Sequence, residues 1–552
     1  MEKGRFMPMS SCATDGKRVG RCGHNGLVAT FTACMLTIAG AAFCAQPAAG
    51  EPQYGGTAIA VVGADPAVLN PNISVGAPDV FAGCILYDAL VRFGEGFRIV
   101  PSLAKSWEVA PDGLTYTFHL TAATWSDGKP VTADDVKFTL LEVSAKYGPK
   151  FIAAGQAIRD ISTPDPLTVV IRLSKPFGPF LFSLACEQNA AILPAHILRG
   201  ADVLKHPATL TTPVSNGPFQ LTGWVRGDRL TFSRNQKYWG KGEPFLDRII
   251  MKIMPDSSAR VLALQAGEVD YIDQYYFPLS AASVLANDPR FVLGKVGYAG
   301  NNLIILNTRQ PSLKDARVRQ ALLIALDRNY IVKNVFLGNG QVAAGPIDTR
   351  IKWAYNPAVN YEKMYAYDPA RAAALLDQAG MPRGPDGTRF TLRLSFDTGR
   401  AEYTSWAQAI QSYWQAVGIK VVLEGAERPV VLKRVYTDYD FDATLQNYST
   451  SGDPALGIWR AYATSAIKQG QAFNNATGYS NPKVDALFDN GRDASGQAQR
   501  AKYYYQVQEI LARDLPILTI HQNVQVGASS ARLHGVWQAG FYQWWHRAWL
   551  QK

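Results

Sequence analysis

A helix that runs directly into a strand is the feature that most limits the possible folds of this chain. In the segment EYTSWAQAIQSYWQAVGIKVVLEG, Trp406, Ile410, Tyr413 and Val417 recur at helical spacing. This spacing gathers the four side chains on one helix face. A glycine then permits the turn into the β-branched run IKVV. Strand and helix patterns alternate through the chain, which predicts an α/β fold of mixed sheets flanked by helices.

The N-terminal part of the chain is richer in strand patterns. GGTAIAVVGA (55–64) is typical of a strand, and VFAGCILYDAL (80–90) of a helix. KSWEVAPDGLTYTFHLT (105–121) alternates around a Pro-Asp-Gly turn and predicts a hairpin. His119 falls on the face opposite the apolar side chains of this hairpin, so we expect it on the solvent side.

Three carboxylates lie close together in WSDGKPVTADDV (125–136). Asp127 belongs to a Ser-Asp-Gly turn, where its side chain can accept bonds from nearby backbone amides. Thr132 occupies an N-cap position and Asp135 follows three residues later, as in a capping box. The pattern therefore predicts a turn and a helix start. No His or Cys lies nearby in the sequence to complete a metal site.

The first fifty residues differ from the rest of the chain. Five basic residues precede the apolar run GLVATFTACMLTIAGAAFCA (26–45), and the small residues QPAAG follow it. This order is typical of a secretory signal peptide over residues 1–50, with Ala48 and Gly50 fitting cleavage before Glu51. An uncleaved membrane anchor is the alternative, because the apolar run approaches spanning length. We expect export to the periplasm.

The charge of the exported chain is diffuse. The full sequence carries a formal net charge of +10. Removal of the leader would leave about +7, without a run of Lys or Arg. Diffuse basicity of this kind does not indicate nucleic-acid binding.

The cysteines divide between the leader and the exported chain. Four of the six lie in the leader, which leaves Cys84 and Cys186. An oxidising compartment could pair these two cysteines, and two buried free thiols are the alternative. No CxxC or Cys/His spacing predicts zinc, and we expect no metal site and no cofactor.

Three segments carry a resemblance to a known family. They are PSLAKSWEVAPDGLTYTFHL with WSDGKPVTADDVKFTL (101–140), LKDARVRQALLIALDR with GNG (313–340), and NNATGYSNPKVDALFDNGRDA with RAKYYYQVQEILARDLPIL (474–518). In order and spacing they resemble the extracytoplasmic solute-binding proteins of ABC importers, in the peptide/nickel-type family, family 5. This family includes dipeptide-, oligopeptide- and nickel-binding proteins.

The resemblance implies a two-lobed periplasmic-binding-protein fold of type II, with hinge-linked mixed sheets. Lobe I would take residues 51–300, with an inserted subdomain at about 95–210. Lobe II would take residues 301–515, and residues 516–552 would return to lobe I. The hinge crossings are expected near NNLIILN (301–307) and LPILTIH (515–521).

The loop YSTSGDPALGIWRAY (448–462) is expected to line the cleft. In relatives the corresponding loop opens with an aromatic residue and ends in an Asp-Pro pair, which Tyr448 and Asp453 match here. Peptide-binding members place an acid between the two to hold the peptide's ammonium group, and this chain has none. Asp453 would then either bind the ligand or cap the helix that follows it.

Other candidate site residues come from the same resemblance. Dipeptide binders place an Arg just before the lobe II helix, where this chain has Asp397, and Arg400 lies three residues later. Arg400 could still offer its bidentate fork to an anionic group, or it is a surface arginine. Weaker alignments add four residues: Ser74, Phe151, Asn301 and His521.

The function implied is capture of a small solute between two lobes and its delivery to a membrane permease. The expected solute is a short peptide or a modified amino acid, opine-like conjugates included, and a nickel chelate or other solute is the alternative. The expected partners are the permease and ATPase subunits, with the protein itself a monomer that binds no nucleic acid. A sensor or chaperone would use the same cleft.

An exported hydrolase is the rival class. The sequence contains no GxSxG, no HExxH and no phosphate-binding glycine loop. We therefore expect a receptor without catalysis.

Overall fold

The structure is a computed structural model, and it describes residues 51–398, 400–449, 452–537 and 542–552. The chain divides into residues 1–49 and a compact unit of residues 50–552. The expected signal peptide, with Ala48 and Gly50, lies outside the described residues. Within the described ranges, no helix combines the length and the apolar character that crossing a membrane requires.

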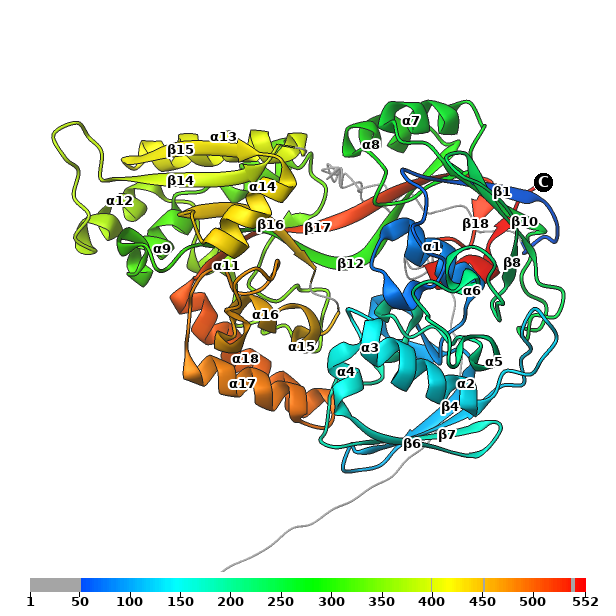
Figure 1. Ribbon diagram of the computed structural model, residues 1–552. Coiled ribbons are helices and arrows are strands. Elements are labelled where there is room, and N and C mark those ends of the chain that lie inside the picture. Colours follow the sequence, from blue (N-terminus) through cyan, green and yellow to red (C-terminus); the bar gives the residue numbers. More distant parts are fainter. Residues whose placement is uncertain (1–50, 399, 450–451, 538–541) are drawn as a thin grey trace, which may run out of the picture. The chain divides into compact units, whose positions relative to one another are not determined.

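One long sheet runs through the described chain, and its order is β15-β14-β16-β12-β17-β11-β1-β10-β9-β8, with β13 paired to β17 (Figure 1). Helices pack against it, which confirms the α/β class. Its strands are β1 (Thr57–Val62), β8 (Phe219–Val225), β9 (Arg229–Arg234), β10 (Arg248–Ile253), β11 (Tyr271–Ile272), β12 (Phe291–Leu306), β13 (Gln341–Val342), β14 (Phe390–Asp397), β15 (Ile419–Ala426), β16 (Ala443–Ser449) and β17 (Ile517–Ser530).

Strands β12 and β17 join two groups of elements. They pair antiparallel from Phe291 with Ser530 to Ile305 with Ile517. At one end β17 pairs with β11, and at the other β12 pairs with β16. We call the elements on the β11 side lobe I and those on the β16 side lobe II. NNLIILN and LPILTIH both lie on or beside these two strands.

The core of lobe II lies on both faces of its sheet. Ile304 and Leu306 belong to one buried cluster, whereas Leu303 and Ile305 belong to another. Successive side chains of a strand point to opposite faces. A continuous apolar run is therefore required here, since neither face of the strand meets water.

Lobe I carries a second sheet of order β4-β5-β7-β6. The expected hairpin is confirmed as β4 (Ala104–Val109) and β5 (Thr115–Leu120), with His119 only half-buried on the outer face. The remaining strands are β6 (Ile158–Asp165) and β7 (Thr168–Leu173). Two short pairs complete the lobe: β2 (Val91–Phe93) with β3 (Ile99–Pro101), and β18 (Leu533–His534) with β19 (Trp549–Leu550).

The three carboxylates of 125–136 are structural, as expected. Asp135 accepts the backbone N–H of Thr132 at 2.8 Å, which completes the capping box of α2. Its other oxygen accepts the backbone N–H of Ala195 at 2.9 Å and so ties α2 (Ala133–Phe138) to α5 (Ala195–Leu198). The carboxylate of Asp127 lies 2.7 Å from Nε2 of His196, and the carboxylate of Asp134 pairs with an arginine guanidinium at 2.9 Å.

The helices flank the sheets. Those of lobe I are α1 (Ala77–Leu86), α2 (Ala133–Phe138), α3 (Ala145–Tyr147), α4 (Ile152–Ala157), α5 (Ala195–Leu198), α6 (Pro207–Leu210), α7 (Ser257–Gln265) and α8 (Ala282–Ala286). Those of lobe II are α9 (Ala316–Ile324), α10 (Arg328–Tyr330), α11 (Tyr361–Met364), α12 (Pro369–Gln378), α13 (Ala401–Ala416), α14 (Arg428–Leu432), α15 (Pro454–Gly457), α16 (Trp459–Tyr462), α17 (Pro482–Asp493) and α18 (Gln497–Asp514).

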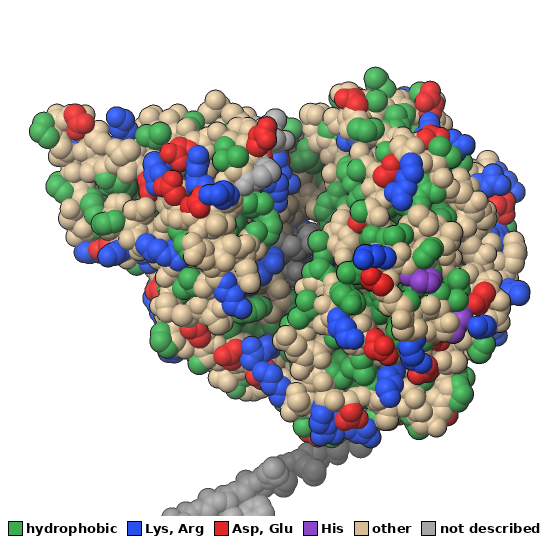
Figure 2. Space-filling view, viewed as in Figure 1, with side chains coloured by type: hydrophobic (Ala, Val, Ile, Leu, Met, Phe, Trp, Pro, Cys, Tyr) green, Lys and Arg blue, Asp and Glu red, His purple; other side chains and the backbone are tan. Residues whose placement is uncertain are grey.

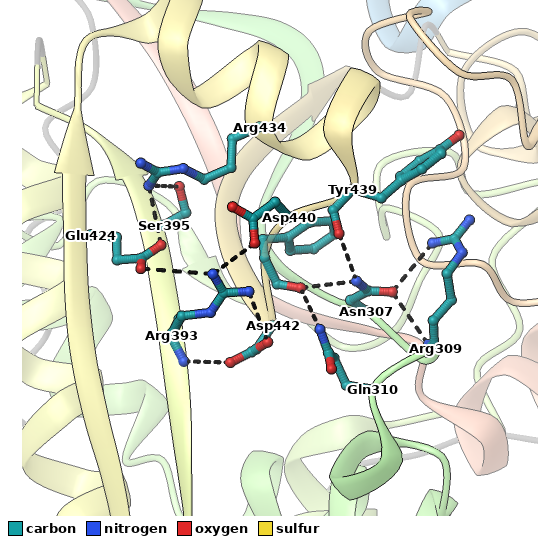
Figure 3. Close-up of polar contacts among 11 residues, drawn as sticks. Asn307, Arg309, Gln310, Arg393, Ser395, Glu424, Arg434, Tyr439, Asp440 and Asp442 are labelled. Carbon is teal, nitrogen blue, oxygen red and sulfur yellow. Dashed lines mark hydrogen bonds and ion pairs between the residues drawn. The ribbon is translucent and has the colours of Figure 1, made fainter.

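An arginine-centred network ties the strands of lobe II together (Figure 3). Arg393 on β14 donates to Asp440 at 2.8 Å, and its backbone N–H donates to Asp442 at 2.8 Å. Arg434 donates to Glu424 on β15 at 3.2 Å. The network joins β14 and β15 to the loop that enters β16, so these segments hold a common register.

A disulfide joins two parts of lobe I. Cys84 on α1 is bonded to Cys186 at the start of the 3-10 turn Cys186–Gln188, across a sequence separation of 102 residues. Both side chains are buried. Of the two alternatives that the sequence left open, the structure contains the bonded pair.

Candidate ligand-binding site

A cavity of about 850 Å³ lies between residues of lobe I and residues of lobe II. Lobe I contributes the tip of the β2–β3 hairpin, residues 95–99, and the segment 178–182. Lobe II contributes residues 350–353, 452–453 and 496–500. The surface is hollowed between the two lobes in Figure 2. A cavity of this volume lies within the usual size range of small-molecule sites.

Aromatic side chains form the apolar wall on the lobe I side. Phe97, at the hairpin tip, packs against buried clusters of both lobes. Its φ is 62°, in the left-handed region that residues other than glycine rarely adopt. Phe93 and Phe182 lie beside it with ring centroids 4.3 Å apart. The hairpin thus aims an aromatic tip at lobe II and holds it in a sparsely populated backbone conformation.

Asp453 and Arg500 form a buried ion pair in the wall of the cavity. Both guanidinium Nη atoms donate to the carboxylate of Asp453 at 2.7 Å. Asp453 also caps α15 by accepting the backbone N–H of Ala455 at 2.9 Å. The guanidinium lies 4.8 Å from the ring centre of Trp353. Of the two roles open to Asp453, the structure shows the cap, and its charge is already paired with Arg500.

Tyr448 and Asn301 are neighbours on paired strands. Tyr448 on β16 lies opposite Asn301 on β12. The Tyr448 hydroxyl lies 2.7 Å from that of Tyr436 and donates to the carbonyl of Asn474 at 3.2 Å. Burial raises the pKa of Tyr448. Asn301 is buried, and its Oδ1 accepts no hydrogen bond from any residue that the structure describes.

His521 lies on β17, where the sequence placed a hinge crossing. Its Nε2 and the carbonyl oxygen of Asn339 are 2.6 Å apart, and its Nδ1 is 3.0 Å from Nδ2 of Asn302. Its ring stacks on Phe336 with centroids 4.3 Å apart. Burial lowers the pKa of His521 to about 4. A neutral imidazole in this position links β17 to the loop before β13 and to β12.

The other expected residues lie elsewhere. Arg400 is exposed before α13 and donates to the hydroxyl of Tyr403 at 3.3 Å. Ser74 bonds to Asp79 of α1 and accepts the backbone N–H of Gly76 at 3.0 Å. Phe151 is fully buried before α4. Among the expected ligand-binding residues, Asp453 is the one that borders the 850 Å³ cavity.

Sequence reasoning missed most of this wall. Trp353, Lys352 and Arg350 lie in a loop that carries no helix or strand pattern, and Phe97 lies at the tip of a short hairpin. Arg500 lies within the third family-like segment, where it is indistinguishable from a surface residue of an amphipathic helix. The cavity brings together segments hundreds of positions apart, and no local pattern encodes that contact.

No group of three or more His, Cys, Asp or Glu side chains within the described ranges could hold a metal ion. The polar groups around the cavity instead suit hydrogen bonding and charge recognition of an organic solute. The cavity combines an apolar wall, a fixed ion pair and basic groups.

Comparison with known protein families identifies the family of this chain. Residues 98–469 match the family described as bacterial extracellular solute-binding proteins, family 5, middle region. The chain belongs to this family. Solute-binding proteins of family 5 are the extracytoplasmic receptors of ABC importers and have a two-lobed fold, as the resemblance of the three sequence segments implied.

Individual family 5 proteins resemble the chain over most of its length. The oligopeptide-binding protein AppA of Bacillus subtilis (strain 168) is 28% identical over 485 residues, which cover 86% of this chain and 87% of AppA. Periplasmic binding protein DppA from Helicobacter pylori, solved with the peptide STSA, has a TM-score of 0.72 at 26% identity, with 91% and 99% of the two chains covered.

A third family 5 protein was solved with a different kind of ligand. AgaA from A. tumefaciens R10, in complex with agropinic acid, has a TM-score of 0.71 at 28% identity, and the match covers 90% of this chain and 99% of AgaA. Family 5 receptors similar to this chain therefore include one solved with a peptide and one solved with agropinic acid.

Proposed function

We propose that this family 5 receptor encloses a short peptide or an opine-like modified amino acid in the 850 Å³ cavity and presents it to the permease of an ABC importer. The observation that carries the proposal is the lining of the cavity by both lobes. A solute held there contacts lobe I and lobe II at once, so it stabilises the closed arrangement over any open one. The permease would then recognise the closed protein.

The ligand contacts follow from the groups around the cavity. The rings of Phe97, Phe182 and Trp353 exclude water from the apolar part of the solute. The carboxylate of Asp453 is engaged by Arg500, so an ammonium group would have to compete with a bidentate guanidinium for it. We therefore place Asp453 in a positioning role, holding the loop that carries Gly452.

The proposal also covers location and partners. The leader pattern of residues 1–50 supports export through a cleaved signal peptide, and the protein would act as a periplasmic monomer beside the permease and ATPase subunits. Closure around a solute requires no bond to be made or broken, so the protein would have no catalytic activity. The alternative ligand, a nickel chelate, would have to bring its own metal ligands, since the described residues form no metal-binding group.

Mass spectrometry of the solute that co-purifies with the protein tests the proposal. We expect a peptide or an amino-acid conjugate at a stoichiometry near one. Small-angle scattering of the stripped protein, with and without that solute, should show a smaller radius of gyration when the solute is present. A protein that carries no solute and keeps one radius with every peptide and opine tested would refute the proposal.

A further inference from the structure

The charges around the cavity do not balance. Four basic residues, Arg98, Arg350, Lys352 and Arg500, border it together with two acidic residues, Glu95 and Asp453. Charges that face a shared cavity in closed lobes act on whatever is enclosed there, because nearby low-dielectric walls concentrate their field. The imbalance therefore bears on the charge of the solute.

Two of the basic residues already have carboxylate partners. Arg500 is paired with Asp453 through two bonds of 2.7 Å. Arg350 donates to Asp348 from Nε at 2.8 Å and to the carbonyl of Asn523 at 2.9 Å. Arg350 fixes the loop that carries it, Arg500 ties helix α18 to the loop of Asp453, and the charges of both arginines are neutralised by the protein itself.

Lys352 and Arg98 are the other two basic residues that border the cavity. No side-chain hydrogen bond or ion pair of either residue exists within the described part of the chain. Lys352 follows the anchored Arg350 in lobe II, and the buried side chain of Ile351 fixes the loop between them. Arg98 follows Phe97 at the hairpin tip of lobe I. Each lobe thus brings one unpaired cation to the cavity on a segment held by packing.

Glu95 is the remaining acid, and it lies at the same hairpin tip as Arg98. Within the described ranges Glu95 makes no side-chain hydrogen bond or ion pair either, so the cavity has two unpaired cations and one unpaired carboxylate. The matching solute carries two acidic groups and one ammonium or iminium group, with a net charge of −1. A neutral dipeptide has one acidic group too few, whereas an acidic dipeptide or an amino-acid–keto-acid conjugate has the full set.

We infer that the receptor selects an anionic amino-acid derivative with two acidic groups, one held by Lys352 of lobe II and the other by Arg98 of lobe I. This inference rests on the proposed function and defines its substrate class. A solute whose two acidic groups bond to the two cations contacts both lobes. Recognition of its charge and closure of the lobes therefore occur together. The same bridge makes selectivity sensitive to salt, because both cations are partly solvated.

Calorimetric titration of the stripped protein with the dipeptides Ala-Glu and Ala-Gln tests the inference. The two peptides have nearly the same size and differ by one carboxylate. We expect Ala-Glu to bind about tenfold more tightly, the size of one charge-assisted bond. Raising the salt concentration should reduce the preference. Agropinic acid serves as a second anionic probe.

Lys352→Gln should remove most of the preference for Ala-Glu, and Lys352→Glu should reverse it. Lys363→Gln, which changes an exposed lysine of α11 outside the cavity, should keep the full preference. Because Lys352 is exposed, thermal melts of its variants should match those of the unchanged protein.

The possible outcomes separate the two proposals. Equal affinity for both dipeptides, or equal losses with both in Lys352→Gln, would overturn the anionic class while leaving the receptor function intact. If neither dipeptide nor agropinic acid binds, the co-purified solute decides: an acidic one supports the inference and a neutral or basic one overturns it. A protein that carries and binds no solute would overturn the receptor function itself.

Discussion

Arg500 shows how a single side chain can hold a cavity wall in place. Its guanidinium donates to Asp453, to the carbonyl of Gly491 at 2.7 Å and to the hydroxyl of Tyr504 at 3.2 Å. Both partners of the ion pair are nearly fully buried. The positive charge of Arg500 is stable in this buried position because each donor group bonds to an acceptor of fixed geometry.

We predict that Arg500→Met lowers the free energy of unfolding by about 3–5 kcal/mol, because it leaves the carboxylate of Asp453 buried without a counter-charge. Urea denaturation measures the loss. Arg317→Met is the matched control, since Arg317 pairs with Asp315 at the surface, and it should cost less than about 1 kcal/mol. Equal costs in the two variants would contradict a structural role for the buried pair.

His521 gives a second prediction at the residue scale. Burial lowers the pKa of its imidazole to about 4, against about 6.5 in an unfolded chain. Between these two values the unfolded state binds the extra proton, so stability must fall as the pH drops from about 6.5 to about 4. The full loss from this group is roughly 3 kcal/mol, at about 1.4 kcal/mol per pKa unit.

His521→Gln should flatten this part of the stability profile. Unfolding free energies at several pH values between 4 and 7 would be compared for the two proteins. Carboxylates titrate in both, so the difference between the profiles isolates the imidazole. Parallel profiles would show that His521 is protonated equally in the folded and unfolded states.

At the scale of elements, the disulfide ties helix α1 to the turn Cys186–Gln188. It closes a loop of about one hundred residues that contains the whole β4–β7 sheet. Cross-links over long loops restrict the unfolded chain most, with a typical stabilisation of about 2–4 kcal/mol. The covalent tie therefore links the segment that carries the second sheet of lobe I to α1, the helix that packs against β8.

We predict that reduction lowers the midpoint of thermal unfolding. The double variant Cys84→Ala/Cys186→Ala should melt at a lower temperature than the oxidised protein, and adding reductant should not change its midpoint. A reductant-insensitive midpoint in the unchanged protein would show that the bond does not form in solution.

For the whole molecule, Gly452 is the point where lobe II meets the aromatic tip of lobe I. Its φ is 70°, and a Cβ there would lie 2.8 Å from ring atoms of Phe182 and Phe97. Real Cβ atoms do not approach carbon so closely, so with a side chain at this position either the two rings or the lobes that carry them must shift. The aromatic tip thus fits lobe II where no side chain intervenes.

We predict that Gly452→Ala weakens solute binding by at least about tenfold and increases the radius of gyration of the solute-bound protein. Gly470→Ala is the matched control. Gly470 has a φ of 80° with open space around it, so alanine there carries the backbone strain without the clash. If both variants bind equally well, contact at Gly452 does not limit closure.

The elements predicted from the sequence were those whose signals are local. The capping box of Thr132 and Asp135 and the hairpin around Pro-Asp-Gly both follow from bonds between residues near each other in the chain. The helix-to-strand unit also holds, as α13 and β15 joined by Gly418 at a φ of 90°. Short-range steric and hydrogen-bonding rules suffice for such features.

The roles of the candidate site residues were harder to predict from the sequence, because these roles depend on partners that are distant in the chain. The role of Asp453 stayed open until Arg500, 47 positions away, was seen to pair with it. Tyr448 was expected beside the ligand, and the structure shows its hydroxyl at that of Tyr436 inside lobe II. The bonding of Cys84 to Cys186 likewise required their positions in space.

The amino-acid sequence by itself determined the α/β class and the family, because periodicity and capping act over a few residues and the family motifs belong to the scaffold. The tertiary structure alone decided which charges are left unpaired around the cavity. Whether a lysine or arginine is neutralised depends on which carboxylate lies within bonding distance, and that distance is set by how two lobes pack. Lys352 and Arg98 look like any other basic residues until the partners of Arg350 and Arg500 are known.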